Sequence, residues 1–196
     1  GVGLSLSSKI LGKKQIVIIY LGDASIEEGI FFESLNFAIV KKIPVIFICE
    51  NNFYSVYSPL SVRQPINREI YKMVRGCHIK AYKTNGNFTN EVVSSFLKAK
   101  NFVEKNGKPV FLEFQTFRWF EHCGPNLDDH LKYRNKKELL YWRKNDPINI
   151  LENFLIKKKW INNNSIKIMK NLITKKINSA FRYAKQSPFP QKKDLY

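Results

Sequence analysis

The chain contains little cysteine and little histidine. It has three residues of each, the number of cysteines is odd, and none of them forms a C-x-x-C spacing. A structural zinc site needs about four such ligands at close spacing, and a disulfide framework needs paired cysteines. The composition argues against both, and it predicts reduced thiols and a cytoplasmic location.

Long apolar segments are also missing. The longest strongly apolar run, Ile16–Leu21, is far shorter than the roughly 20 residues that cross a bilayer. Gly1–Lys9 lacks the charged and then apolar segments of a signal peptide. We therefore expect neither a membrane span nor a signal peptide. Because the sequence begins without Met and inside a recognisable pattern, we also expect an N-terminally truncated chain.

Acidic residues and arginine are scarce beside lysine. The chain has 33 basic residues, of which 7 are Arg, against 16 acidic residues, and its net charge is +17. Such a charge is typical of nucleic-acid or acidic-membrane binding, but phosphate and base recognition relies mainly on arginine forks. Because the basic residues are also spread along the chain, we interpret the charge as composition drift. Part of this positive charge would attract an acidic partner subunit or a phosphate-bearing cofactor.

Apolar runs alternate with helical patterns over residues 1–120. A run that is apolar on both faces predicts a buried, parallel strand. Alternation of such strands with helices predicts an α/β domain with a mainly parallel sheet flanked by helices. The predicted strands are Gln15–Leu21, Val45–Glu50, His78–Lys83 and Pro109–Thr116, and the predicted helices are Glu27–Lys42, Arg68–Arg75 and Thr89–Lys105.

Apolar residues at helical spacing also predict the buried faces of two of these helices. Thr89 is the predicted N-cap of the third helix, and Asn106-Gly107 ends it. The candidate core residues are Phe31, Leu35, Ala38 and Ile39 in the first helix and Val92, Val93, Phe96, Ala99 and Val103 in the third.

The pattern changes after Trp119. Residues 121–135 are mostly polar and are predicted to form a loop. Beyond this loop only helical patterns remain, so residues 136–196 are predicted to be a C-terminal helical region. The helices expected there are Lys136–Lys144, Pro147–Lys158 and Ser165–Ala184.

Polar residues follow the first two predicted strands. Gly22-Asp23-Ala24-Ser25 ends the first and Glu50-Asn51-Asn52-Phe53-Tyr54 ends the second. Ligands of open α/β sheets bind beyond the carboxyl ends of the strands, so Asp23 and Asn52 meet if the two strands are neighbours. A carboxylate oxygen and an amide oxygen are suitable ligands for Mg²⁺. Diphosphate oxygens and water would complete the octahedral coordination of the ion. Small residues after Asp23, and the N-terminus of the next helix, would let backbone N–H groups approach a phosphate.

The spacing of these residues is that of a known motif. Residues 25–50, which number 26, separate Gly22-Asp23-Ala24 from Asn51-Asn52, and this arrangement resembles the thiamine-diphosphate-binding motif. The stretch Gly22–Tyr54 resembles the alpha subunit of the thiamine-diphosphate-dependent decarboxylating component of 2-oxo acid dehydrogenases, of the pyruvate and branched-chain type. Further segments that resemble this family are Gly1–Leu4, Thr84–Asn87, Phe111–Arg118, Asp146-Pro147-Ile148 and Pro188–Pro190.

The resemblance implies roles for individual residues. Asp23 and Asn52 would coordinate Mg²⁺ through their side chains, and Tyr54 would do so through its main-chain carbonyl. His122 would be catalytic, facing the cofactor's thiazolium ring and assisting acyl transfer to a lipoyl group. The implied cofactor-binding residues are Gly22, Asp23, Ala24, Ser25, Asn52 and Tyr54.

The resemblance also implies an activity and partners. The activity is oxidative decarboxylation of a small, pyruvate-like 2-oxo acid, with transfer of the acyl group to a lipoyl or other acceptor. The partners are a beta subunit in an α₂β₂ heterotetramer, which supplies the glutamate that activates the cofactor, and a lipoyl-bearing acyltransferase.

Two departures from the family leave the substrate and the acceptor open. Ala24 replaces the second glycine of the motif, and Cys123–Asp129 replaces the serines that usually follow the loop histidine. A transketolase-like or other thiamine enzyme half remains an alternative. A basic nucleic-acid-binding or scaffold protein without catalysis is another.

Overall fold

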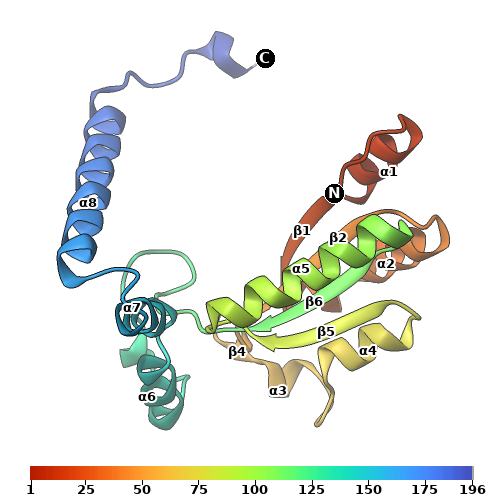
Figure 1. The fold of residues 1–196 in the computed structure, drawn as a ribbon, viewed down its shortest axis with the longest axis horizontal. Coiled ribbons are helices and arrows are strands. Elements are labelled where there is room, and N and C mark those ends of the chain that lie inside the picture. Colours follow the sequence, from red (N-terminus) through yellow and green to blue (C-terminus); the bar gives the residue numbers. More distant parts are fainter. Residues whose placement is uncertain (196) are drawn as a thin grey trace. The chain divides into compact units, whose positions relative to one another are not determined.

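A computed structural model describes residues 1–195, which form two compact units, one of residues 1–147 and one that begins at Ile148. The first unit is built on a four-stranded sheet with the order β1-β2-β6-β5, in which all neighbours are parallel (Figure 1). The prediction of a mainly parallel α/β fold is confirmed. The strands are β1 (Val17–Gly22), β2 (Val45–Asn51), β5 (Lys80–Asn85) and β6 (Val110–Gln115).

Helices and one small hairpin connect these strands. No helix within residues 1–195 is long and apolar enough to span a bilayer. The first unit contains α1 (Val2–Ile10), η1 (Ser25–Glu27), α2 (Gly29–Val40), the hairpin of β3 (Tyr54–Ser55) and β4 (Ser58–Pro59), α3 (Leu60–Arg63), α4 (Ile70–Gly76), α5 (Thr89–Asn106), η2 (Asp129–Leu131) and α6 (Lys136–Lys144). From Pro147 on, the chain forms α7 (Pro147–Lys157), α8 (Asn163–Gln186) and η3 (Lys192–Leu195).

The central strand β2 separates two apolar clusters. Its alternate side chains point to opposite faces, as the two-residue period of a strand requires. Val45, Phe47 and Cys49 pack with α2 and α4 on one face, and Ile46 and Ile48 pack with α5 on the other (Figure 1). Burial on both faces explains why the sequence of β2 is an uninterrupted apolar run.

Some sequence-based expectations for the helices are wrong. Helix α1 was not anticipated, because three of its nine residues are serine and it buries Ser5, whose hydroxyl donates to Pro44 O at 2.9 Å. Thr89 is not an N-cap, since Phe88 holds that position and Thr89 is the first helical residue. Val93 is 50% exposed, because α5 buries only a narrow stripe that includes Ala99 and Val103.

Gly86 stands where a side chain has no room. Its N–H donates to Gln115 O at 2.7 Å, and a Cβ atom at this position would lie 2.9 Å from the same oxygen and 3.2 Å from Phe114 Cβ. Gly86→Ala is therefore expected to lower the free energy of unfolding by roughly 1–3 kcal/mol, as overpacking does. Urea unfolding would measure this, with Gly76→Ala as control, because a Cβ at Gly76 meets nothing within 4 Å. Equal stability of the two variants would contradict the expectation.

Candidate functional site

The pairing of β1 with β2 brings the two predicted motifs to the same edge of the sheet. Gly22 lies opposite Glu50 in the register, so Asp23 and the Asn51-Asn52 pair both follow directly at the carboxyl ends of neighbouring strands. Adjacent strands lie about 4.8 Å apart. Asp23 is 2% exposed, so its carboxylate is a buried charge at this edge. The expected neighbourhood of the two strand ends is confirmed.

Asn51 and Asn52 shape the turn that follows β2. The Asn51 Oδ1 accepts from Phe53 N, and the Asn52 Oδ1 accepts from Tyr54 N, each at 3.0 Å. Phe53 takes a left-handed conformation (φ 67°) between these two side-chain turns. An amide oxygen has two lone pairs, so Asn52 Oδ1 keeps one for a cation.

Glu113 is a buried acceptor for the first residue of the asparagine pair. This β6 side chain is 2% exposed, its Oε1 accepts from Asn51 Nδ2 at 2.9 Å, and its Oε2 accepts from Tyr71 N at 3.0 Å. It therefore fixes both the turn after β2 and the start of α4. Sequence reasoning missed this residue, although a single acid inside the apolar run of β6 was a usable signal.

Arg63 is the cation at this edge of the sheet. Its Nη2 forms an ion pair with Asp23 Oδ2, and its Nη1 lies 2.5 Å from Glu27 Oε1. Gln64 Nε2 also donates to Glu27 Oε1, at 2.9 Å. Burial disfavours the charge of the Arg63 guanidinium, but the carboxylates of Asp23 and Glu27 outweigh this effect and raise its pKa. Arg63 was also missed by sequence reasoning, although arginine is rare in this chain.

The donor set fits a hard cation with an anionic ligand. Within residues 1–195 no cluster of three or more His, Cys, Asp or Glu side chains could hold a metal, so a metal here would need the mixed set of Asp23, Asn52 and a main-chain carbonyl. The N–H groups of Ala24 and Ser25 donate to no other described residue, which leaves them available to a phosphate. The helix that was predicted to begin at Glu27 begins at Gly29, because the short η1 turn precedes it.

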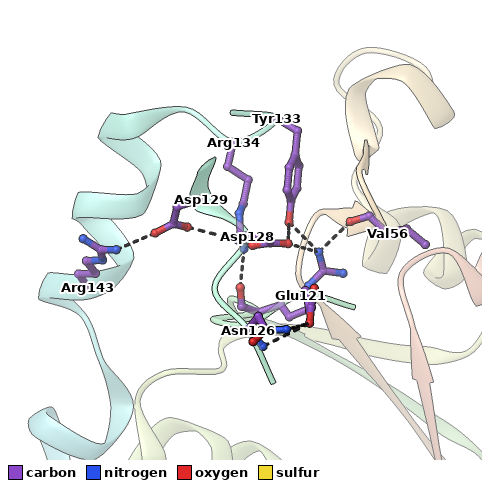
Figure 2. A network of polar contacts seen from close by, with 9 residues as sticks. Val56, Glu121, Asn126, Asp128, Asp129, Tyr133, Arg134 and Arg143 are labelled. Atoms are coloured by element: carbon purple, nitrogen blue, oxygen red, sulfur yellow. Dashed lines mark hydrogen bonds and ion pairs between the residues drawn. The ribbon is translucent and has the colours of Figure 1, made fainter. Parts of the chain in front are cut away.

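The predicted loop 121–135 is held by buried ion pairs, which Figure 2 shows. Asp128 and Arg134 are 1% and 6% exposed, and Arg134 Nη2 pairs with Asp128 Oδ1. Tyr133 donates to Asp128 Oδ2 at 2.6 Å, and Arg118 Nη2 donates to the Tyr133 hydroxyl at 2.7 Å. Arg118 Nε and Nη1 are buried and have no partner among the described residues.

The same network attaches the loop to the turn after β2. Arg118 Nη2 also donates to Val56 O at 2.8 Å. The Tyr133 ring packs edge-on against Tyr54 and Tyr57, with centroids 5.4 and 5.1 Å away. The loop therefore lies against the segment that carries Asn52 and Tyr54.

His122 lies in an exposed turn of this loop. Its side chain makes no hydrogen bond to another residue in the described part of the chain. The structure thus brings together the ends of β1 and β2, but it does not fix the imidazole against them.

Tyr54 and Tyr133 donate to carboxylates, which affects their ionisation. Burial, followed by the hydrogen bond to Glu138 Oε2 at 2.7 Å, raises the pKa of Tyr54. Burial, followed by the hydrogen bond to Asp128, raises the pKa of Tyr133. A phenol with a raised pKa stabilises the fold fully below its unfolded pKa, near 10, and this contribution is lost as pH rises through the folded pKa.

We therefore predict that Tyr54 and Tyr133 ionise above the ordinary tyrosine range in an alkaline titration followed by ultraviolet absorbance. The late phase should shrink in Tyr133→Phe and in Tyr54→Phe. A single phase near pH 10 for all nine tyrosines, with the fold intact, would contradict this prediction.

The fold and the site define an α/β domain whose buried polar side chains gather at the carboxyl ends of its strands, where open α/β sheets bind their ligands. Residues 1–193 match the family described as "Dehydrogenase E1 component", and the chain belongs to this family.

Relatives align over the whole chain. It is 28% identical to the pyruvate dehydrogenase E1 component subunit alpha of Rickettsia bellii. It is 29% identical to the mitochondrial 2-oxoisovalerate dehydrogenase subunit alpha of Macaca fascicularis, and 30% identical to the testis-specific pyruvate dehydrogenase E1 component subunit alpha of Homo sapiens. All 196 residues are covered in each case, but the chain spans only 59%, 43% and 49% of these proteins' lengths.

Proposed function

We propose that this chain carries the metal and diphosphate half of the active site of a thiamine-diphosphate-dependent 2-oxo acid dehydrogenase alpha subunit. The observation that carries the proposal is the buried Asp23 beside Asn51-Asn52 at the ends of paired parallel strands, within a chain of the dehydrogenase E1 family. Family membership favours this function over a transketolase-like half and over a nucleic-acid-binding or scaffold role.

The proposed site assigns Asp23, Asn52 and the Tyr54 carbonyl to Mg²⁺. Gly22 lies beside them, and the N–H groups of Ala24 and Ser25 bind the diphosphate. Thiamine diphosphate, when bound, supplies a carbanion that adds to the oxo group of the substrate and accepts the electron pair released with CO₂. Asp23 and Asn52 orient the cofactor through the metal, and Glu113 keeps the asparagine turn in place.

The loop 121–135 has a separate role in the proposal. The pair of Asp128 with Arg134 holds the loop against the Tyr54 hairpin, where it limits the access of water to the reacting groups. His122 moves a proton during acyl transfer to a lipoyl or other acceptor. We assign residues 1–120 to the cofactor domain and 136–196 to a helical region, and we propose a beta subunit, an α₂β₂ assembly and a cytoplasmic location.

The activity can be tested with the full natural chain co-expressed with its beta partner. CO₂ release should be measured with a panel of 2-oxo acids, including pyruvate and 3-methyl-2-oxobutanoate, in the presence of Mg²⁺ and thiamine diphosphate. We expect release from at least one acid, and its loss in Asp23→Asn but not in Glu33→Gln, an exposed acid on α2. Release from none of the acids above the level of Asp23→Asn would contradict the proposed function.

A further inference from the structure

The ion pair at Asp23 has a consequence for metal binding. The carboxylate assigned to the metal is occupied by a cation of the protein itself, the guanidinium of Arg63. We propose that Arg63 is an exchangeable counter-ion of Asp23, which a divalent cation must displace, so that Arg63 sets the metal affinity of the site. This inference rests on the proposed function, because it concerns the same carboxylate.

Burial explains why Asp23 needs a counter-ion. Its side chain is 2% exposed, and an ionised carboxylate is not stable in such a place without a compensating charge. Among the described residues only Arg63 supplies this charge, through its contact with Asp23 Oδ2. A dication that binds this carboxylate repels a guanidinium in contact with it, so the two cations compete for Asp23.

Arg63 can break its ion pair with Asp23 and still keep its other contacts in the site. Its Nη1 remains 2.5 Å from Glu27 Oε1, and its Nε donates to Ser58 O at 3.3 Å. Its side chain is 12% exposed and it ends the four-residue helix α3, so only a short segment needs to adjust. Glu27 and Ser58 would therefore hold the guanidinium next to the metal after the exchange.

The balance of charge favours the exchange. Asp23, Glu27 and Arg63 together carry one excess negative charge, which attracts a dication to the site. A purely structural role of the Arg63–Asp23 ion pair predicts the opposite change in metal affinity. If Arg63 only supports the fold, its removal distorts the site and weakens metal binding, whereas removal of a competitor strengthens it.

The test uses Mn²⁺ alone as the probe, with the natural chain co-expressed with its beta partner. Free Mn²⁺ is measured by electron paramagnetic resonance, so catalysis is not involved. We expect Arg63→Gln to bind Mn²⁺ more tightly, by a factor on the order of ten or more. Removing one positive charge in contact with Asp23 removes a repulsion that lowers the affinity by at least this factor. Arg182→Gln, which removes an equal charge from the exposed surface of α8, should bind as the unchanged protein does.

Arg63→Lys provides a second variant in case the glutamine variant folds poorly. A lysine is a compact point charge that cannot bridge two carboxylates as a guanidinium does, so its Mn²⁺ affinity should lie between those of the unchanged protein and Arg63→Gln. Added Mg²⁺ should also raise the melting temperature of both variants more than that of the unchanged protein. Equal or weaker Mn²⁺ binding in the folded variants would overturn the inference.

The two proposals can fail separately. If Asp23→Asn abolishes Mn²⁺ binding while Arg63→Gln and Arg63→Lys leave it unchanged, the metal site stands and the exchange is wrong. If Asp23→Asn retains full Mn²⁺ affinity, the metal site itself is wrong.

Discussion

Asp128→Asn is expected to release the loop 121–135 and to lower the free energy of unfolding by about 3–5 kcal/mol, the usual result of breaking a buried ion pair. Asp128 and the Arg134 side chain are almost fully buried, and each is the main charge partner of the other. Without the carboxylate, Arg134 keeps only its longer contact with Asp129 Oδ1 at 3.4 Å, and Tyr133 and Arg118 lose the negative charge that they share.

Limited proteolysis and urea unfolding would measure this effect. The variant should be cut within residues 121–135 at protease concentrations that leave the unchanged protein intact. Asp129→Asn is the matched control, because Asp129 is 27% exposed, pairs with Arg143 at 2.7 Å and reaches Arg134 only at 3.4 Å. An exposed pair contributes at most about 1 kcal/mol. Equal effects of the two substitutions would show that burial of the Asp128 pair does not hold the loop.

Glu113→Ala is expected to destabilise the sheet edge that carries the site. The substitution leaves Asn51 Nδ2 and Tyr71 N without their acceptor, and each unsatisfied buried donor costs roughly 1–3 kcal/mol. Together with the cavity that forms, the loss should be roughly 3–5 kcal/mol. Because Asn51 precedes Asn52, metal affinity should fall as well.

Glu113→Gln separates the two effects of this carboxylate. Glutamine keeps the size and one acceptor oxygen, but its amide group would face one of the two donors, so about half of the loss should remain. Unfolding and Mn²⁺ titration should be compared with Glu104→Ala, since Glu104 is 50% exposed on α5 and, among the described residues, pairs with Lys100 alone. If Glu113→Ala is as stable as Glu104→Ala, Glu113 does not fix the turn.

The hydrophobic pattern predicted the elements well where a strand is buried on both faces or a helix has a clear apolar stripe. The apolar run Val45–Glu50 became β2, and Lys136–Lys144 became α6 with the predicted bounds. The predicted third strand, His78–Lys83, is displaced in β5 (Lys80–Asn85), because His78 takes a left-handed conformation (φ 62°) that ends α4 before the strand begins. Residues with mixed polarity, such as those of α1, carried no such signal.

The candidate site was only half predictable. Asp23 and Asn52 follow strands and keep a motif spacing, so their meeting could be inferred from the pairing of two parallel strands. Glu113 stood out as a single acid in an apolar run, but its partner and that of Arg63 could not be inferred, because the contacts with Asn51 and Asp23 join residues 62 and 40 positions apart. The pairing of Asp128 with Arg134 likewise depends on the path of a loop rather than on a periodic pattern.

The most direct test of the central claim is a calorimetric titration of thiamine diphosphate with Mg²⁺ into the natural chain co-expressed with its beta partner. We predict saturable binding, an affinity at least about 100-fold lower in Asp23→Asn, where a metal-bound carboxylate is lost, and a lower affinity in Asn52→Ala. Asn101→Ala, an exposed position on α5, should bind as the unchanged protein does. Undiminished binding in both Asp23→Asn and Asn52→Ala would contradict the assignment of this strand edge to the cofactor.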